Sequence, residues 1–148
     1  MLPKHLRIHA VLIVACLAMI LIPLYNHNKS PDNQKLEQAQ PVAVEFLQLI
    51  DGGKYAESWQ SSASLVRDKV TQQEWIEKLD KTRSRYGELI QRNQKSTRSA
   101  TALKDSPEGE YIILTYESDF QKAEDVSEYV TVMRDGDSWK VASYAMQQ

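Results

Sequence analysis

Apolar residues divide the chain into an oily N-terminal stretch, a half with helical spacing and a half with strand-like spacing. Residues 10–25 are almost entirely apolar, and a polar stretch over residues 26–34 follows them. Up to Gly87 the apolar positions then recur three and four residues apart, which predicts helices, and beyond Gly87 they recur as they do in strands. The pattern therefore predicts a leader over residues 1–25, a polar linker over 26–34 and a single domain over 35–148.

The first helix of the domain is indicated by one apolar face. Its members recur at helical spacing, at Ala43, Phe46, Leu47 and Ile50. Pro41 suits the first turn of this helix, where the backbone needs no hydrogen-bond donor. Gly52 and Gly53 suit its end, because glycine tolerates the left-handed conformation of a helix cap.

Two further helices are expected before the strands begin. A second, shorter helix is indicated by Tyr55, Trp59 and Val66. Thr71 and Glu74 have the spacing of a capping box, in which each side chain satisfies a free backbone donor of the other residue. This spacing predicts a third helix that starts at Thr71 and ends at Gly87.

Four strands are expected in the second half. Residues 88–103 are polar and rich in Ser and Thr, which is typical of an edge strand, and residues 111–120 and 126–132 are rich in strand-forming residues. The Asp135-Gly136 pair is a strong turn signal that leads into a last strand over residues 139–146. The sum is an α+β fold, with about three helices on an antiparallel sheet of about four strands.

The leader predicts where the domain works. A helix over residues 6–25 would be long enough to cross a hydrocarbon layer of about 30 Å. Lys4 and Arg7 favour an N-terminus in the cytoplasm, so we expect a single-pass signal anchor in the inner (cytoplasmic) membrane and a domain on the periplasmic or extracellular side. Two alternatives stay open: a cleaved signal peptide, and a lipoprotein modified at Cys16 within Ile13-Val14-Ala15-Cys16.

Charge is distributed unevenly along the domain. Residues 67–98 hold nine Lys and Arg against five acids, whereas residues 105–137 hold ten acids against Lys122 and Arg134. This asymmetry predicts either a basic and an acidic side that orient partners, or charges that pair with one another across the fold. The composition argues against nucleic acid as a partner, because aromatic residues are scarce in the basic segment.

The domain lacks the residue types on which common catalytic sites depend. The three histidines lie at positions 5, 9 and 27, and the single cysteine is Cys16. The domain therefore offers no histidine base, no thiol and no His/Cys metal site, and no cofactor motif occurs. One carboxylate cluster around Glu124, Asp125 and Glu128 lacks the regular spacing of a calcium loop and is expected to be a solvated hairpin end.

Aromatic residues provide a candidate ligand pocket between helices and sheet. Its members, with one cation, are Tyr55, Trp59, Trp75, Arg83, Tyr116, Trp139 and Tyr144. The simpler interpretation is that these side chains form the core of a small domain without disulfides. Arg83 follows Trp75 and Leu79 on an apolar helix face and would need a carboxylate partner there, for which we expect Glu128.

Several short motifs together resemble a bacterial family called domain of unknown function 4019. They are Ala43, Phe46, Leu47, Ile50, Asp51, Gly53, Tyr55, Ser58, Trp59, Trp75, Arg83, Gly87 and Arg92, then Pro107, Gly109, Tyr111, Tyr116, Phe120, Glu128, Asp135, Gly136, Trp139 and Tyr144. The resemblance implies a secreted or anchored bacterial domain with no assigned reaction. The order of elements is also similar to nuclear transport factor 2-like and cystatin-like folds, in which a curved sheet surrounds the helices and often leaves a cavity.

These observations leave functions of different classes open. The favoured hypothesis is a non-enzymatic, membrane-tethered module that binds another protein of the cell envelope, with the lipid bilayer contacted through residues 6–25. The alternative is a carrier or sensor of a small ligand, for which a cavity of about 300 Å³ behind Trp59 and Tyr144 is expected. An enzyme with weak activity, in secreted or lipidated form, is the third.

Overall fold

A computed structural model describes residues 30–148. The predicted anchor over residues 1–25 and residues 26–29 of the predicted linker lie outside these described residues. Within residues 30–148, no helix is long and apolar enough to cross a membrane. The described part is an α+β domain in which four helices precede a four-stranded antiparallel sheet.

The first described helix, α2 (Asn33–Asp51), begins earlier than the sequence indicates. Asp32 caps it, because its side chain accepts a hydrogen bond from the backbone N–H of Gln34 at 3.2 Å. The expectation that Pro41 lies in the first turn is wrong: Pro41 lies within the helix, and it is exposed. Eight residues N-terminal to the proline extend the helix, and their start falls in the predicted linker. The apolar face is as predicted, with Phe46, Leu47 and Ile50 buried among its members.

The predicted second helix is two short helices, α3 (Tyr55–Ser61) and α4 (Ser64–Lys69). The break at Ser62 and Ala63 has a tertiary cause. Both residues have extended backbone, and the N–H of Ala63 donates to the carbonyl of Val141 in the sheet at 2.9 Å. The N–H of Ala63 thus bonds to the sheet instead of to a carbonyl of the preceding helix, and the spacing of apolar residues does not indicate this bond.

The next helix, α5 (Gln72–Tyr86), has the predicted start and end. Thr71 and Glu74 form the capping box, and Gly87 follows the helix with a φ of 79°, a conformation that favours glycine. The buried residues Trp75, Leu79 and Arg83 share one face of this helix.

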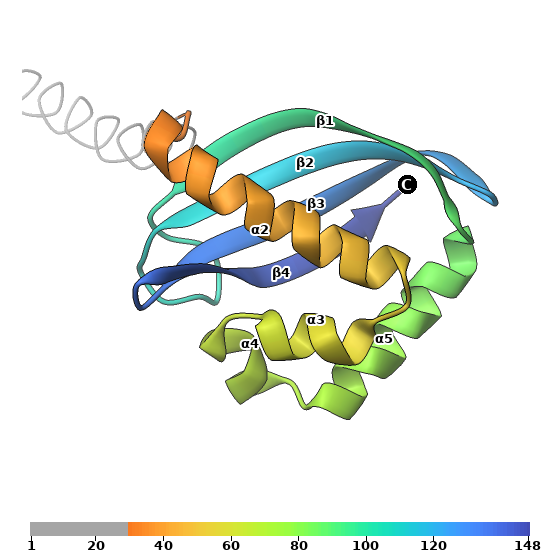
Figure 1. The fold of residues 1–148 in the computed structure, drawn as a ribbon, viewed down its shortest axis with the longest axis horizontal. Coiled ribbons are helices and arrows are strands. Elements are labelled where there is room, and N and C mark those ends of the chain that lie inside the picture. Colours follow the sequence, from red (N-terminus) through yellow and green to blue (C-terminus); the bar gives the residue numbers. More distant parts are fainter. Residues whose placement is uncertain (1–29) are drawn as a thin grey trace, which may run out of the picture.

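The sheet is an antiparallel meander in the order β1-β2-β3-β4. Its strands are β1 (Leu89–Ala100), β2 (Tyr111–Phe120), β3 (Ala123–Asp135) and β4 (Ser138–Gln147). The polar strand is at the edge, and the Asp135-Gly136 turn joins the last hairpin, both as predicted. Figure 1 shows the sheet as a curved layer, with α2 lying across it and the three shorter helical segments beyond β4.

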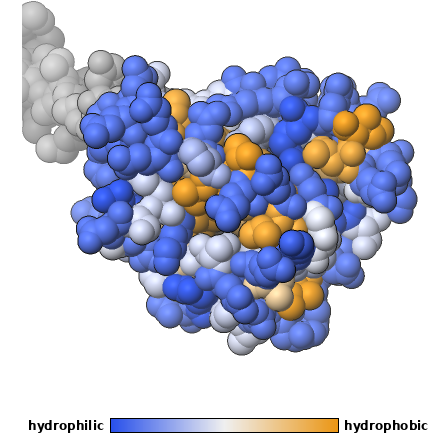
Figure 2. Space-filling view, in the orientation of Figure 1, coloured by the Kyte–Doolittle hydropathy of each residue, from blue (hydrophilic) through white to orange (hydrophobic). Residues whose placement is uncertain are grey.

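The main core lies between α2 and the inner face of the sheet. Leu114 of β2 and Val130 of β3 are paired neighbours in the sheet, and both are fully buried beneath Phe46 and Ile50 of α2. A smaller cluster around Tyr111 and other residues lies on the opposite face. The viewed surface is mostly hydrophilic, and its apolar areas are small and separate (Figure 2).

Candidate functional site

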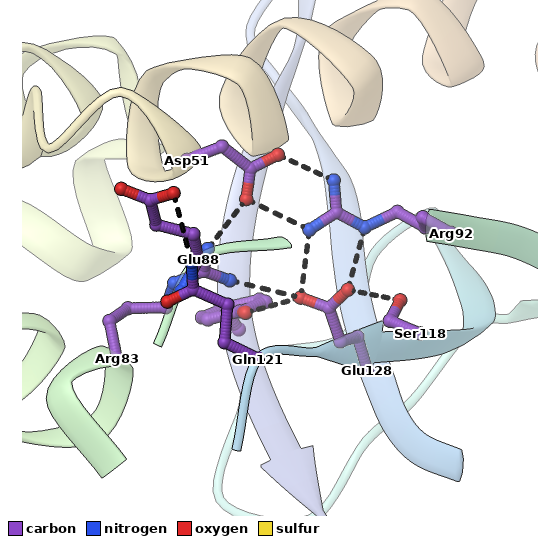
Figure 3. A network of polar contacts seen from close by, with 8 residues as sticks. Asp51, Arg83, Glu88, Arg92, Ser118, Gln121 and Glu128 are labelled. Atoms are coloured by element: carbon purple, nitrogen blue, oxygen red, sulfur yellow. Dashed lines mark hydrogen bonds and ion pairs between the residues drawn. The ribbon is translucent and has the colours of Figure 1, made fainter. Parts of the chain in front are cut away.

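Four charged residues from four elements meet at one end of the core (Figure 3). They are Asp51 at the end of α2, Arg83 in the last turn of α5, Arg92 of β1 and Glu128 of β3. We call these four residues the ion network. Local sequence positions each of them. Asp51 and Arg83 lie at helix ends that Gly52 and Gly87 terminate, and Arg92 and Glu128 lie on strands that both pair with β2.

Glu128 is the centre of the ion network. It lies between Val126 and Val130 on the inward side of β3, and its side chain is 0% exposed. The Nε and Nη2 atoms of Arg92 donate to its two carboxylate oxygens at 2.6 and 3.1 Å. Ser118 donates its hydroxyl to Oε2 at 2.6 Å, and Tyr144 donates to Oε1 at 2.5 Å. A buried carboxylate with four donors is well satisfied.

Asp51 joins the two arginines. It accepts from Nη1 and Nη2 of Arg92 at 2.6 and 3.0 Å, and from Nη2 of Arg83 at 2.9 Å. Its side chain is 22% exposed, so the ion network reaches solvent on this side only in part. Arg92 therefore holds two carboxylates at once, each through two hydrogen bonds.

Arg83 is buried, and its side chain is 6% exposed. Its Nη1 atom lies 3.7 Å from Oε1 of Glu128, which is ion-pair distance but longer than a hydrogen bond. Among the described residues this Nη1 has no hydrogen-bond partner. The guanidinium also lies 4.7 Å from the centre of the Phe120 ring, a cation–π distance. The structure thus brings the predicted partners Arg83 and Glu128 together, while Asp51 is the nearer partner of Arg83.

The ion network shifts the pKa values of two side chains, Arg92 and the neighbouring Tyr144. Burial would lower the pKa of Arg92, but its hydrogen bonds to Asp51 and Glu128 raise it above the ordinary value. Burial and the neighbouring Glu128 carboxylate raise the pKa of Tyr144 well above the usual tyrosine value. Two arginines face two carboxylates, so the formal charges cancel. Such an arrangement joins elements of the fold and leaves no free nucleophile or base.

The aromatic residues predicted to line a pocket all belong to one hydrophobic cluster. Trp75, Tyr116 and Trp139 are buried in it, and Tyr55, Trp59 and Tyr144 pack against it. Phe46 lies between two of them, with ring centres 6.2 Å from Trp75 and 5.7 Å from Tyr144.

The polar atoms of these aromatic side chains are used within the domain. The indole of Trp59 donates to Val70 at 2.9 Å, that of Trp75 to Ser58 at 3.0 Å and that of Trp139 to Gln38 at 3.2 Å. Such internal bonds are typical of core aromatic residues. Among the buried polar atoms of these aromatic side chains that the structure describes, the hydroxyl of Tyr116 has no hydrogen-bond partner.

Clefts beside these residues are small and open to the surface. One, bordered by Trp75 and Tyr144, holds about 200 Å³. A second of about 200 Å³ adjoins it at Lys78 and Tyr144. Both are smaller than the cavity of about 300 Å³ that a carrier of small ligands would need.

The expectation of a solvated cluster is wrong for Glu128, which is buried in the ion network, whereas Glu124 and Asp125 are exposed near the β2–β3 turn. Within residues 30–148, no group of His, Cys, Asp and Glu has the arrangement of metal ligands. Instead, Asp119 accepts a hydrogen bond from the backbone of Asp125 at 2.9 Å, and Glu117 pairs with Lys95 at 2.6 Å. Part of the charge asymmetry in the sequence is therefore neutralised between the neighbouring strands β1 and β2.

Two members of the ion network were not predicted as members of a site. Arg92 lies on β1, where no alternation of apolar residues marks the inward side. Asp51 lies at a helix end, where a polar residue needs no special explanation. The sequence signal for the ion network lies on β2 and β3. Glu128 and Ser118 take inward positions between buried apolar residues, and a buried carboxylate requires cations or several hydrogen-bond donors.

The fold and the ion network define a small helix-on-sheet domain whose polar interior is self-contained. Residues 42–144 match the model of a family described as "Protein of unknown function (DUF4019)". The chain belongs to this family. No match was found among curated proteins or among solved structures. The wider likeness to nuclear transport factor 2-like and cystatin-like folds stays a prediction.

Proposed function

We propose that this chain is a membrane-tethered, non-enzymatic domain on the outer side of the cytoplasmic membrane, where it binds another envelope protein. The proposal rests on the combination of a predicted anchor with a domain whose aromatic side chains are packed in its core and whose sheet ends in the edge strands β1 and β4. One observation carries it: the charged residues most deeply buried are bonded to each other, so the groups left to act are those of the surface.

The ion network supports binding because it makes the surface rigid. It ties the end of α2 and the end of α5 to β1 and β3 through Asp51 and Arg92. A surface that is ordered before it meets a partner loses less conformational entropy on binding. The carrier hypothesis is less well supported, because Phe46 fills the space between Trp75 and Tyr144 where a ligand would lie.

Crosslinking in intact cells tests the proposal. The full-length chain with a C-terminal affinity tag would be expressed at its natural level, treated with a cleavable amine crosslinker and captured under denaturing conditions. We expect a specific protein of the envelope to be recovered with it. The proposal fails if the folded, membrane-bound chain captures no protein above the level of a tagged, unrelated membrane protein.

A further inference from the structure

The two edges of the sheet differ in how they are protected against pairing. The β1 edge carries Arg92, Lys95 and Arg98, and its register shifts at two places, between Leu89 and Gln91 and between Gln94 and Ser96. Charges and bulges of this kind prevent another strand from pairing with an edge. The β4 edge carries no charged residue after Lys140, along residues 141–148.

The β4 edge already accepts one hydrogen bond from outside the sheet. The N–H of Ala63, in the extended link between α3 and α4, donates to the carbonyl of Val141 at 2.9 Å. Among residues 30–148, it is the one backbone bond to β4 that comes from outside the sheet's own ladders. Beyond Val141 the edge continues to Gln147, which gives room for about 20 Å of extended chain.

A groove follows this free part of β4. It consists of the two adjoining clefts of about 200 Å³ each, and we call it the β4 groove. Trp75 and Leu79 of α5 line one side, and Tyr144 and Met146 of β4 line the other. The apolar lining offers places for the alternate side chains of a strand.

The charge of the β4 groove selects the occupant. Lys69 and Lys78 line it, and no carboxylate does. The Nζ atom of Lys69 donates to a backbone carbonyl of Asp105 at 3.0 Å, and Lys78 makes no ion pair with any described residue. Two lysines that form no ion pair with a described residue, beside an apolar lining without carboxylates, favour a ligand that combines apolar and acidic side chains.

We propose that the β4 groove binds an extended segment of a protein partner in which apolar and acidic residues alternate. The segment adds to the sheet along β4, its apolar side chains enter the two clefts, and its carboxylates lie near Lys78 and Lys69. This inference rests on the proposed function, because it specifies the kind of partner and the surface that binds it.

A photoreactive residue at two positions tests the groove. Benzoylphenylalanine replaces Ala145 in the β4 groove or, as a comparison, Asn93 on β1 of the full-length chain in intact cells. We expect Ala145 to give a crosslink to another protein, within an acidic, extended segment. A crosslink from Asn93 alone would overturn the groove and keep the proposed function, and a crosslink from neither position would count against both. A crosslink to a second copy of the chain, or to a segment without acidic residues, would overturn the occupant.

Charge reversal tests the electrostatic part of the same inference. Lys78→Glu should lower the crosslink yield from Ala145 about fivefold or more, since it replaces an attraction by a repulsion. Lys81→Glu is the matched control, because Lys81 is exposed on the same helix outside the groove and should leave the yield unchanged. Equal thermal midpoints of the two variants show that both fold. Equal yields from both variants would overturn the role of Lys78.

Discussion

Arg92 and Glu128 form a two-fold hydrogen-bonded ion pair across the inner face of the sheet, although β2 lies between their strands. The guanidinium reaches both oxygens of a carboxylate that is 0% exposed, at 2.6 and 3.1 Å, and the same guanidinium holds Asp51. One side chain on the edge strand therefore links a helix end to the centre of the sheet. The main role that this geometry supports is structural.

Removal of Arg92 is expected to destabilise the domain severely. Arg92→Gln leaves Glu128 buried without its main cation, which costs about 3–5 kcal/mol of the free energy of unfolding. Lys95→Gln is the matched control: Lys95 lies on the same strand as Arg92 and pairs with Glu117 of β2, but both side chains are about half exposed, so its loss should change the free energy of unfolding little. Urea denaturation measures both, and similar losses in the two variants would contradict the structural role.

The raised pKa of Tyr144 predicts that the free energy of unfolding falls at alkaline pH. Its pKa is raised by burial and by Glu128, so the folded state keeps the hydroxyl protonated where the unfolded chain ionises. The resulting stability is complete below about pH 10 and is lost as the pH rises above that value toward the raised pKa. Tyr144→Phe should lower the free energy of unfolding at pH 7 by about 1–3 kcal/mol, because a hydrogen bond to a buried charge is lost.

The alkaline slope of the free energy of unfolding tests whether the fold protects the hydroxyl of Tyr144. From pH 9 to 11, the free energy of unfolding should fall less steeply in Tyr144→Phe than in the unchanged protein. Tyr129→Phe serves as the comparison, because Tyr129 is half-buried on β3 and takes no part in the ion network. Equal slopes in the unchanged protein and Tyr144→Phe would show that Tyr144 is not protected by the fold.

The hydrogen bonds of Asp135 predict that the free energy of unfolding falls at acidic pH. It accepts the backbone N–H of Ser64 at 2.7 Å and its hydroxyl at 2.9 Å, and so caps the start of α4 from the sheet. The backbone hydrogen bond lowers the pKa of Asp135 below its usual value. The stability it adds is present above about pH 4 and is lost as the pH falls through the lowered pKa.

Thermal denaturation from pH 2 to 7 tests the cap. Asp135→Asn keeps one acceptor oxygen but loses the charge and the second, so at pH 7 it should cost less than the loss of about 1 kcal/mol that removal of a cap causes, and the difference from the unchanged protein should shrink as the pH falls. Asp137→Asn alters an exposed acid near the same turn and should change little. A constant difference at every pH would refute a role for the charge.

A filled core predicts that small apolar molecules do not stabilise the unchanged protein. Phe46→Ala should cost about 3–5 kcal/mol and leave a cavity between Trp75 and Tyr144. Benzene should then raise the thermal midpoint of Phe46→Ala, because it binds apolar cavities in the folded state. If benzene raises the midpoint of the unchanged protein as much, a ligand cavity exists and the carrier hypothesis gains support.

Local signals in the sequence predicted local features well. The capping box at Thr71 and Glu74 and the turn at Asp135 and Gly136 need only residues close along the chain, and the structure confirms both. The predicted start of α2 is wrong, because proline favours the first turn of a helix and this helix begins eight residues before Pro41.

Features that depend on distant residues could not be predicted in full. The break between α3 and α4 depends on a bond from Ala63 to Val141, and the ion network depends on the pairing of β1 with β2 that brings Arg92 beside Ser118. A polar strand without alternation does not show which side faces inward. The family resemblance was correct, and it named no site.

The cellular location of the intact chain is the most direct test of the whole account. Cells are fractionated, the mass of the chain is measured, and spheroplasts are treated with a protease that cannot enter them. The account predicts a full-length chain in the membrane fraction whose domain is digested from outside. Full-length chain dissolved in the cytosol and protected from the protease would contradict it.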